Sequence, residues 1–345
     1  MEVATMKEAD FPKYISAFLA EYLPCQKNAS TKTIASYRDT FKLFLIFCEK
    51  ERGLKPERLR ILSIDTELIT SYLAWLEKER NCSISTRNQR LAALHSFFKY
   101  VQKEYPENLR EIQRILSIPY KKGKKTMVSY LTGPEMQILL SQPDCTTASG
   151  FRDAVLLSVL YDTAARVQEL TEIQLKDIRL DNPSVITLHG KGNKTRQVPI
   201  MSQTKELLKK YIEQKDVHAG ISKGNNFLFV NQKKQQLSRW GISYILDKYV
   251  EMAKIDIRFQ IGFPITPHIV RHAKAMHLLQ SGVNLIYIRD FLGHAECSTT
   301  EIYAKSDTEM KRKAIENAYI DVLPNAFPDW EKDGELMSWL NSLTK

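Results

Sequence analysis

The chain has 345 residues, 43% hydrophobic and 26% charged, a composition typical of a globular protein with room for two domains. Its formal net charge of +10 favours a polyanionic partner such as nucleic acid. A charge of this size can also simply keep a protein soluble. The five cysteines are scattered, which argues against a disulfide framework or a zinc ribbon and suits a reducing compartment. We find neither a signal peptide nor an apolar run of about eighteen residues, so we expect a cytoplasmic protein.

The first part of the chain is predicted to be helical. Apolar residues recur there at spacings of three and four, which gives a helix one buried face. Ser30 and Thr31 are candidate N-caps of the second helix. Four such helices can bury one compact core. The segments with this spacing are 15–22, 37–48, 69–76 and 91–101.

The second and fourth of these helices begin with side chains that suit contact with DNA. Hydroxyl groups and arginines at a helix start can bind phosphates and reach base edges in the major groove. The same residues also suit a well-capped, solvated helix face, so both interpretations stay open. The candidate DNA contacts are Thr31, Lys32, Arg38, Ser85, Arg87 and Arg90.

A domain boundary is predicted near residue 119, where a proline and a glycine interrupt the helical pattern. Four lysines there would repel one another into an extended segment that can follow a phosphate backbone. Thr132 and Glu135 then form a capping box that starts a new helix. We therefore predict an N-terminal domain over 1–118, a basic linker over 119–130 and a second domain over 131–345. The lysines are Lys121, Lys122, Lys124 and Lys125.

The second domain is predicted to be mostly helical, with one small β-hairpin. Residues 185–188 and 196–200 are short and β-branched, and the turn-like residues between them would carry Lys191, Lys194 and Arg196 at the hairpin tip. The fold class is thus mainly α. Further helices are expected over 203–214, 240–252, 268–280 and 284–291.

Several short motifs of this domain supply groups that can hold and attack a phosphodiester. Arginine is always charged and binds phosphate bidentately, and lysine can donate a proton when neighbouring cations lower its pKa. Tyrosine can act as a covalent nucleophile. The motifs, in chain order, are Ala165-Arg166, Gly190-Lys191-Gly192, His268-x-x-Arg271, Leu292-Gly293-His294 and Tyr303.

The order and spacing of these motifs resemble those of the tyrosine recombinases of the phage integrase family, over about residues 10–310. The resemblance implies that Arg166 and Arg271 clamp the scissile phosphate and that Glu169 supports the pocket. It assigns to Lys191 the protonation of the leaving 5′ oxygen, with Lys194 as an alternative acid. It implies no metal and no cofactor.

The resemblance also assigns the remaining catalytic roles. It implies that His268 lies near the proton of the nucleophile, that His294 hydrogen-bonds the scissile phosphate and that Tyr303 attacks. Tyr287 and Tyr319 are rival nucleophiles in principle, but neither has the spacing from His294.

A different interpretation of the histidines is a metal site. His268 and His272 are spaced i, i+4 on an expected helix, but no acidic residue lies between them as in His-Glu-x-x-His. We therefore do not expect a metal. The family often has a glycine where this chain has Ala164, and the small residue is retained.

The resemblance extends to DNA binding. It implies a helical, SAM-like core-binding domain at the N-terminus and backbone phosphate contacts by Lys194 and Arg196. The start of the helix at Ser238-Arg239-Trp240 resembles a segment that contacts DNA in the family, and an ordinary capped helix is the alternative for it.

The implied function is site-specific recombination through a 3′-phosphotyrosyl intermediate and a Holliday junction, by four protomers on two DNA sites. An amphipathic tail, 336–343, would dock into a neighbouring protomer or pack back on its own domain. We expect an integrase or transposase of a mobile element, with a Xer-type resolution enzyme as the alternative. A relaxing enzyme like a type IB topoisomerase and a non-catalytic DNA-binding regulator are further alternatives.

Overall fold

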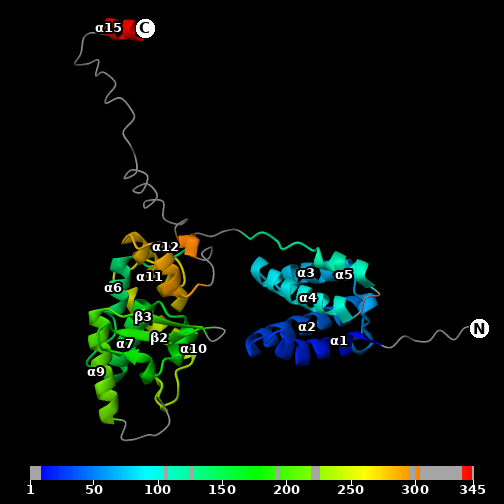
Figure 1. Ribbon diagram of the computed structural model, residues 1–345, viewed down its shortest axis with the longest axis horizontal. Helices are drawn as coiled ribbons and strands as arrows, with labels where there is room; N and C mark the ends of the chain where they lie inside the picture. The colour runs from blue at the N-terminus through cyan, green and yellow to red at the C-terminus, as the bar shows by residue number, and fades with distance from the viewer. Residues whose placement is uncertain are drawn as a thin grey trace, which may run out of the picture. The chain divides into compact units, whose positions relative to one another are not determined.

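The computed structural model describes residues 9–104, 108–123, 128–190, 194–218, 226–294, 300–303 and 336–343. The chain divides into two compact units, Met1–Thr126 and Met127–Lys345 (Figure 1). Both units are dominated by helices, and the mainly α fold class predicted from the sequence is confirmed. In the described part of the chain, no helix is both long enough and apolar enough to cross a membrane.

The described residues of the first unit form helices joined by loops, with no strand among them. The sequence predicted one helix near its start, but the structure has an α-helix followed by a π-helix that contains Pro24. The three other predicted helices are present, and the structure adds a further helix just before the predicted boundary. The elements are α1 Phe11–Ala17, η1 Phe18–Gln26, α2 Thr31–Arg52, η2 Pro56–Arg58, η3 Ile61–Ser63, α3 Thr66–Lys78, α4 Ile84–Glu104 and α5 Leu109–Leu116.

Aromatic side chains fill the core of the first unit. The rings of Phe41 and Phe97 lie 5.1 Å apart, and those of Phe18 and Phe97 lie 5.4 Å apart, in both cases edge to face. Such pairs stabilise a core beyond the burial of their apolar area. The Ser30 hydroxyl accepts from the backbone N–H of Thr33, so the predicted N-cap of α2 is present.

Helix α4 holds the beginning of the basic segment in place. The Arg87 guanidinium donates to the carbonyl of Pro119 at 3.2 Å. The Asn88 side chain makes two hydrogen bonds with the backbone of Lys121, at 2.8 and 3.1 Å. His95 adds a hydrogen bond to the hydroxyl of Tyr120. Residues 119–121 are therefore anchored on α4, where the sequence predicted a segment kept extended by charge repulsion alone.

The second unit packs helices around a three-stranded antiparallel sheet of order β1-β2-β3. The predicted hairpin is present, and Leu188 pairs with Arg196. Arg196 therefore belongs to a strand and not to the hairpin tip. The elements are α6 Gly133–Leu140, α7 Ala148–Thr163, α8 Val167–Glu172, η5 Leu175–Asp177, β1 Ile178–Arg179, β2 Val185–His189, β3 Thr195–Pro199, α9 Ser202–His218, α10 Arg239–Ala253, α11 Pro267–Gln280, α12 Leu285–Leu292 and, in the tail, α15 Leu336–Ser342.

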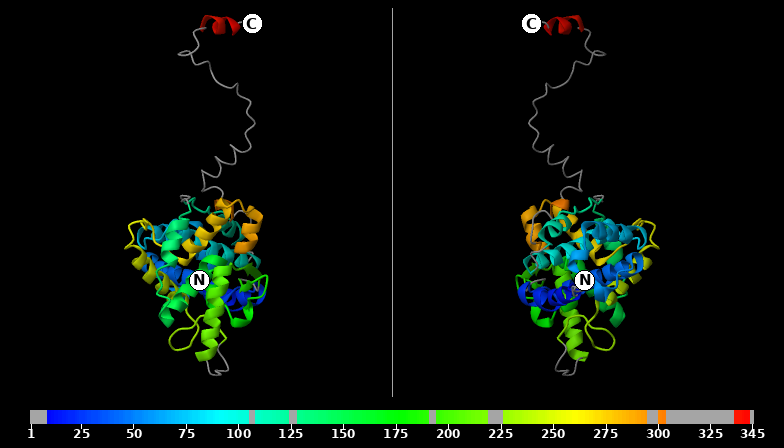
Figure 2. Two further views of the ribbon diagram at one scale, coloured as in Figure 1. Left: turned by 90° about the vertical axis from the view of Figure 1, so that its left-hand side faces the viewer. Right: turned by 90° about the vertical axis from the view of Figure 1, so that its right-hand side faces the viewer.

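Helix α7, which the sequence pattern did not reveal, is the central element of the second unit. Most of its residues are buried, because it packs against both α9 and α11. Helix α9 lies on the outer side of the unit, facing the viewer in the left panel of Figure 2. Helices α11 and α12 contact each other, and α12 also contacts β3. This packing brings the end of α7 next to α11.

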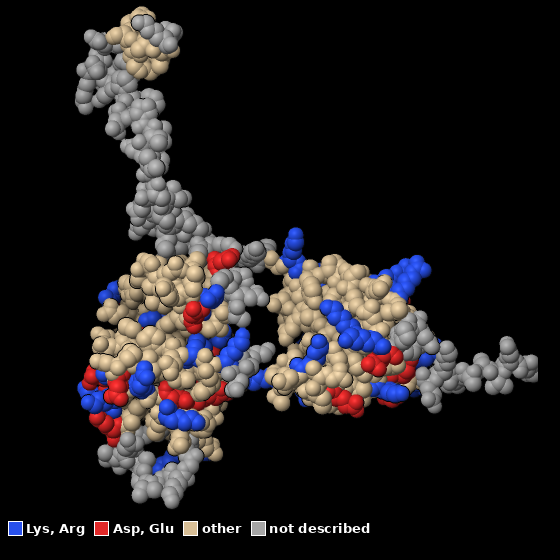
Figure 3. All heavy atoms as spheres, viewed as in Figure 1, with Lys and Arg blue, Asp and Glu red and all other residues tan. Residues whose placement is uncertain are grey.

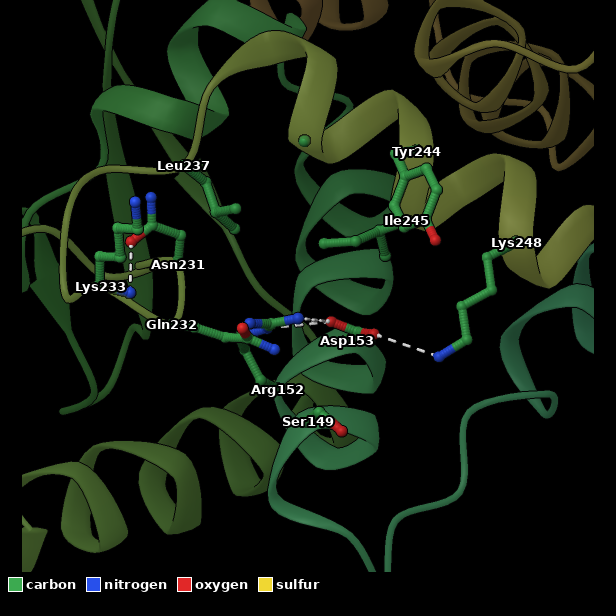
Figure 4. A pocket seen from close by; sticks show the side chains of 11 residues that line it. Ser149, Arg152, Asp153, Asn231, Gln232, Lys233, Leu237, Tyr244, Ile245 and Lys248 are labelled. Carbon is green, nitrogen blue, oxygen red and sulfur yellow. Dashed lines mark hydrogen bonds and ion pairs between the residues drawn. The ribbon is translucent and has the colours of Figure 1, made fainter.

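A buried carboxylate joins α7 to α10. Asp153 accepts two hydrogen bonds from Arg152 and one from the hydroxyl of Tyr249, and Lys248 lies 3.9 Å away. Arg152, Asp153 and Lys248 line part of a pocket of about 500 Å³, and Figure 4 shows Arg152 and Lys248 approaching Asp153 from opposite sides. Because a buried charge is tolerated only when it is paired and hydrogen-bonded, we assign this cluster a structural role.

We expect Asp153→Asn to lower the free energy of unfolding of the second unit by about 3 kcal/mol, because Arg152 would lose its charged partner in a buried setting. Urea unfolding followed by circular dichroism measures this change. Glu251→Gln, which removes the exposed partner of Lys254, is the matched control and should leave the midpoint unchanged. Equal midpoints for the two variants would contradict the structural role of Asp153.

Candidate active site

Five segments of the second unit that are distant in sequence meet at one site. They are the junction of α7 and α8, strand β3, the first half of α11, the end of α12 and residues 300–303. Ala164 ends α7 in the left-handed conformation, with φ of 46°, and is fully buried. Gly293 ends α12 in the same conformation. A left-handed residue at the end of a helix turns the chain sharply, so both helix ends present their carbonyl groups to the site.

The carboxylate of Glu169 is bound by two guanidinium groups. Arg166 donates to it from its backbone N–H and from Nη1, both at 2.8 Å. Arg196 donates to both carboxylate oxygens, at 2.9 and 2.8 Å. Burial acts to raise the pKa of Glu169, but the hydrogen bonds from Arg196 and Arg166 outweigh it and lower the pKa to about 2. Glu169 is therefore a permanent negative charge among the arginines.

Arg196 has a different position from the one expected. Its side chain is largely buried, and it donates from Nε to the carbonyl of Phe291 at 3.0 Å. Arg196 therefore connects β3, α8 and the end of α12, and the guanidinium is occupied by these contacts. The sequence predicted a phosphate contact at this position.

Arg271 is the buried cation of the site, with only 3% of its surface exposed. It donates to the carbonyl of Ala164 at 2.6 Å and to the carbonyl of Leu292 at 2.5 Å. These bonds use two of the five N–H donors of the guanidinium. Burial and the charges of Arg166 and Arg196 lower the pKa of Arg271 to about 10, so it stays protonated at neutral pH.

Tyr303 is buried beside two imidazole rings, with 1% of its surface exposed. Its hydroxyl is 2.8 Å from Nδ1 of His272. The ring of His294 stacks nearly parallel to the tyrosine ring, and Nδ1 of His294 is 3.0 Å from the Thr300 hydroxyl. Burial raises the pKa of Tyr303, while Arg271 and Arg166 act in the opposite direction.

Three histidines of the site are held neutral. Burial lowers the pKa of His272 to about 4, with help from His268 and Arg271. Burial also lowers the pKa of His294 to about 4, and Arg271 and Arg166 add to the effect. The pKa of His268 is lowered by burial and by the same two arginines. These imidazoles can therefore accept protons or hydrogen bonds at neutral pH.

Most of the predicted catalytic residues lie together in this site. They are Arg166, Glu169, His268, Arg271, His294 and Tyr303. Lys191 lies outside the described residues, and so does the rival tyrosine Tyr319. Lys194, the alternative acid, is exposed next to β3. The other rival, Tyr287, is 70% exposed on α12.

Sequence reasoning missed two residues of the site. Arg196 was assigned to DNA, and His272 was considered only as half of a metal pair. The signal for His272 was its i, i+4 spacing from His268, because that spacing puts both side chains on one face of α11. In the described ranges of the chain, no group of His, Cys, Asp and Glu side chains could hold a metal ion.

The predicted DNA contacts of the first unit differ in accessibility. Arg87 is buried and occupied by Pro119 and Asn88. Arg90 donates to the Ser36 carbonyl and the Thr40 hydroxyl, so this side chain is also engaged. The exposed candidates at the two helix starts are Thr31, Lys32, Arg38 and Ser85.

The predicted contacts of the basic segment and of α10 are exposed where they are described. Lys121 forms an ion pair with Glu77 at 2.6 Å, and Lys122 is exposed. Lys124 and Lys125 lie outside the described residues. Arg239 is exposed at the start of α10, beside Trp240. Figure 3 shows Lys and Arg side chains at the surface of both units, interspersed with Asp and Glu.

Comparison with known families shows to which family the chain belongs. A model of the phage integrase family matches residues 129–310, and a model of the phage integrase N-terminal SAM-like domain matches residues 15–105. The chain belongs to the phage integrase family. The resemblance inferred from the sequence is thus confirmed, and the protein is placed among the tyrosine recombinases, enzymes that cleave and rejoin DNA.

Several relatives are similar to this chain over nearly their whole length. The protein y4rC of Sinorhizobium fredii, provisionally named an integrase/recombinase, is 36% identical over 98% of this chain and 99% of its own. Tyrosine recombinase XerC of Bacillus subtilis is 31% identical over 89% of this chain and 95% of its own.

Solved structures share the fold. The XerH site-specific recombinase bound to palindromic difH substrate aligns with a TM-score of 0.66 at 23% identity, over 85% of this chain and 81% of that chain. The Tn1549 transposon integrase in complex with transposon right end DNA aligns with a TM-score of 0.65 at 18% identity, over 87% of this chain and 97% of that chain.

We expect Glu169→Gln to lower the free energy of unfolding by about 3 kcal/mol at pH 7, because two guanidiniums lose their carboxylate. The folded-state pKa of Glu169 is depressed to about 2, so its contribution is present at neutral pH and is lost as pH falls from about 4.5 to about 2. The difference between wild type and variant should shrink over that interval. Urea unfolding at a series of pH values measures it.

The control for this experiment is Glu206→Gln, which changes an exposed carboxylate on α9. It should match the wild type at every pH. A stability difference for Glu169→Gln that does not change with pH would contradict the assigned ionisation.

Proposed function

We propose that this protein is a site-specific DNA recombinase in which Tyr303 attacks the scissile phosphate. The observation that carries the proposal is the position of the Tyr303 hydroxyl. It lies in a site with Arg166, Arg271 and neutral histidines, which is the set of groups that phosphodiester attack requires.

The arginines stabilise the transition state. Attack on phosphorus increases the negative charge on the two non-bridging oxygens, and fixed guanidiniums offset that charge without a metal ion. Arg271 is held in place by two backbone carbonyls, and Arg166 by Glu169, so neither needs to reorganise during the reaction. His294 supplies a further contact to the phosphate.

Cleavage then leaves a 3′-phosphotyrosyl link to Tyr303 and a free 5′ hydroxyl. Lys191, which lies in sequence between β2 and β3, is the acid that protonates the leaving 5′ oxygen. The 5′ hydroxyl of a partner strand attacks the phosphotyrosine and restores the DNA. Two such rounds exchange both strands through a Holliday junction.

The biological role that we propose is integration or transposition of a mobile element. The relatives provisionally named integrase/recombinase and the likeness to a transposon integrase support this role. Chromosome-dimer resolution is the second candidate, because several similar proteins are named XerC and XerD.

The working assembly in this proposal is four protomers on two DNA sites. The SAM-like unit and the basic segment bind the duplex, with Thr31, Lys32, Ser85, Lys122 and Arg239 among the contacts. The tail helix α15 docks into a neighbouring protomer. The exposed apolar residues Met337 and Leu340 of α15, and Leu343 directly after it, support a docking role, since such side chains are stabilised by burial.

We expect Tyr303→Phe to form no covalent DNA adduct while it retains DNA binding, since only the hydroxyl is lost. Wild-type protein, incubated with fragmented genomic DNA of the source organism and denatured, should carry DNA whose ends identify the target site. Tyr287→Phe is the matched control and should form as much adduct as the wild type. An adduct on the Tyr303→Phe protein would overturn the proposal.

Strand exchange distinguishes the recombinase from a relaxing enzyme. When a duplex of the trapped sequence has a nick just 3′ of the cleavage site, cleavage releases the short fragment that carries the new 5′ hydroxyl and leaves the protein bound covalently to the DNA. Joining of an added partner duplex is expected from a recombinase. Relaxation of supercoiled plasmid without joining would favour the topoisomerase-like alternative.

We expect Leu340→Asp, in the tail helix, to reduce assembly of the four-protomer complex on DNA by about tenfold or more, because a charge would have to be buried. Native gel electrophoresis with fluorescent duplexes measures the assembly. Ser338→Asp, on the same helix, is the control. Unchanged assembly by the Leu340→Asp protein would contradict docking in trans.

A further inference from the structure

The hydroxyl of Tyr303 has a specific partner in the site, and that partner is His272. Nδ1 of His272 is 2.8 Å from the hydroxyl oxygen, and the two rings lie 5.6 Å apart. His268, the histidine that the motif places near this proton, lies in the first turn of α11, where one part of its side chain is exposed and burial of the rest lowers its pKa. Among the described residues, no hydrogen bond joins His268 to Tyr303. The geometry therefore selects His272 as the group next to the proton.

The protonation state of His272 also fits acceptance of that proton. With its pKa lowered to about 4, the imidazole is neutral at physiological pH and carries one unprotonated nitrogen. In the tautomer with hydrogen on Nε2, Nδ1 is that nitrogen and accepts from the tyrosine hydroxyl. Phenols titrate near pH 10, so a tyrosine needs such an acceptor to attack at neutral pH.

We infer that His272 is a further catalytic residue, which takes the proton of Tyr303 as the hydroxyl oxygen attacks phosphorus. This inference rests on the proposed function. The O–P bond to Tyr303 forms, the bond from phosphorus to the 5′ oxygen breaks, and the tyrosine proton moves to Nδ1 of His272. The leaving oxygen takes its proton from the separate acid. In the rejoining step, His272 returns its proton to the departing tyrosine oxygen.

The surroundings of His272 explain why the transfer is coupled to DNA. On α11 it faces His268 and Arg271, and across the site it faces Tyr303 and His294. Without DNA, the positive charge of Arg271 disfavours a cationic imidazole. A bound phosphodiester brings negative charge, which increases during attack and stabilises the imidazolium. The base therefore becomes effective when a phosphate occupies the site.

Helix α11 carries an internal control. Nδ1 of His277 is also 2.8 Å from a tyrosine hydroxyl, that of Tyr161, and this second pair lies on the same helix. Both imidazoles have pKa values lowered chiefly by burial. A substitution at His277 therefore removes the same kind of hydrogen bond without touching the nucleophile.

The test measures the rate of covalent adduct formation against pH. The probe is a duplex of the trapped sequence with sulfur in place of the bridging 5′ oxygen at the cleavage site. The sulfur leaves without a proton donor, so the rate reports on the attack. His272→Asn is the main variant, because the amide oxygen of asparagine can accept the Tyr303 hydrogen bond but not the proton.

We expect the His272→Asn protein to react on the order of 10² to 10⁴ times more slowly than the wild type at neutral pH. Its rate should rise about tenfold per pH unit, because tyrosinate must then form without help. The wild type should have a nearly flat profile between about pH 6 and 9. His277→Asn should follow the wild type. The smaller variant His272→Ala should regain activity when imidazole is added.

Three outcomes would overturn the inference. They are an unchanged rate in His272→Asn, a slow rate with the same flat pH profile as the wild type, and no effect of imidazole on His272→Ala. A wild-type adduct that persists in Tyr303→Phe would instead overturn the proposed function itself. A wild-type adduct lost in Tyr303→Phe, together with unchanged His272 variants, would leave the function intact and remove His272 from it.

Discussion

The structure of the active site depends on one carboxylate placed among three guanidiniums. Arg166, Arg196 and Arg271 would repel one another at this partly buried site, and Glu169 offsets part of that repulsion while it fixes two of the three side chains. The carboxylate is itself buried, and its burial is tolerated because every oxygen is hydrogen-bonded. A cationic site with an internal anion is stable without DNA and remains attractive to a phosphate.

Backbone carbonyls have a second role in this arrangement. Arg271 is held by the carbonyls of Ala164 and Leu292, which belong to the ends of two different helices. Helix ends have unpaired carbonyls, so a buried guanidinium can satisfy two of them at once. The same contacts tie α7, α11 and α12 into one unit. Catalytic geometry and the packing of this part of the domain are therefore coupled.

Much of the fold could be predicted from the sequence, because most helices carry an apolar stripe and clear caps. Helix α7 was missed because it is buried on nearly all sides and shows no amphipathic period. The candidate catalytic residues were identified from motif order. Arg196 was assigned to DNA and His272 was given no role, since residue type and spacing do not show which side chains turn toward each other. That information resides in the packing of β3 and α11 against α12.

The glycine at the end of α12 cannot be replaced by a larger residue without affecting the Arg196 side chain. Gly293 has φ of 64°, and a Cβ built on it would lie 3.0 Å from Cδ and Nη1 of Arg196. Any larger residue would thus be strained in its backbone and would also push against the guanidinium that holds Glu169. A single added methyl group could disturb the ion network without altering any charge. Glycine at position 293 thus protects the ion network sterically, because it leaves the space that the Arg196 guanidinium needs.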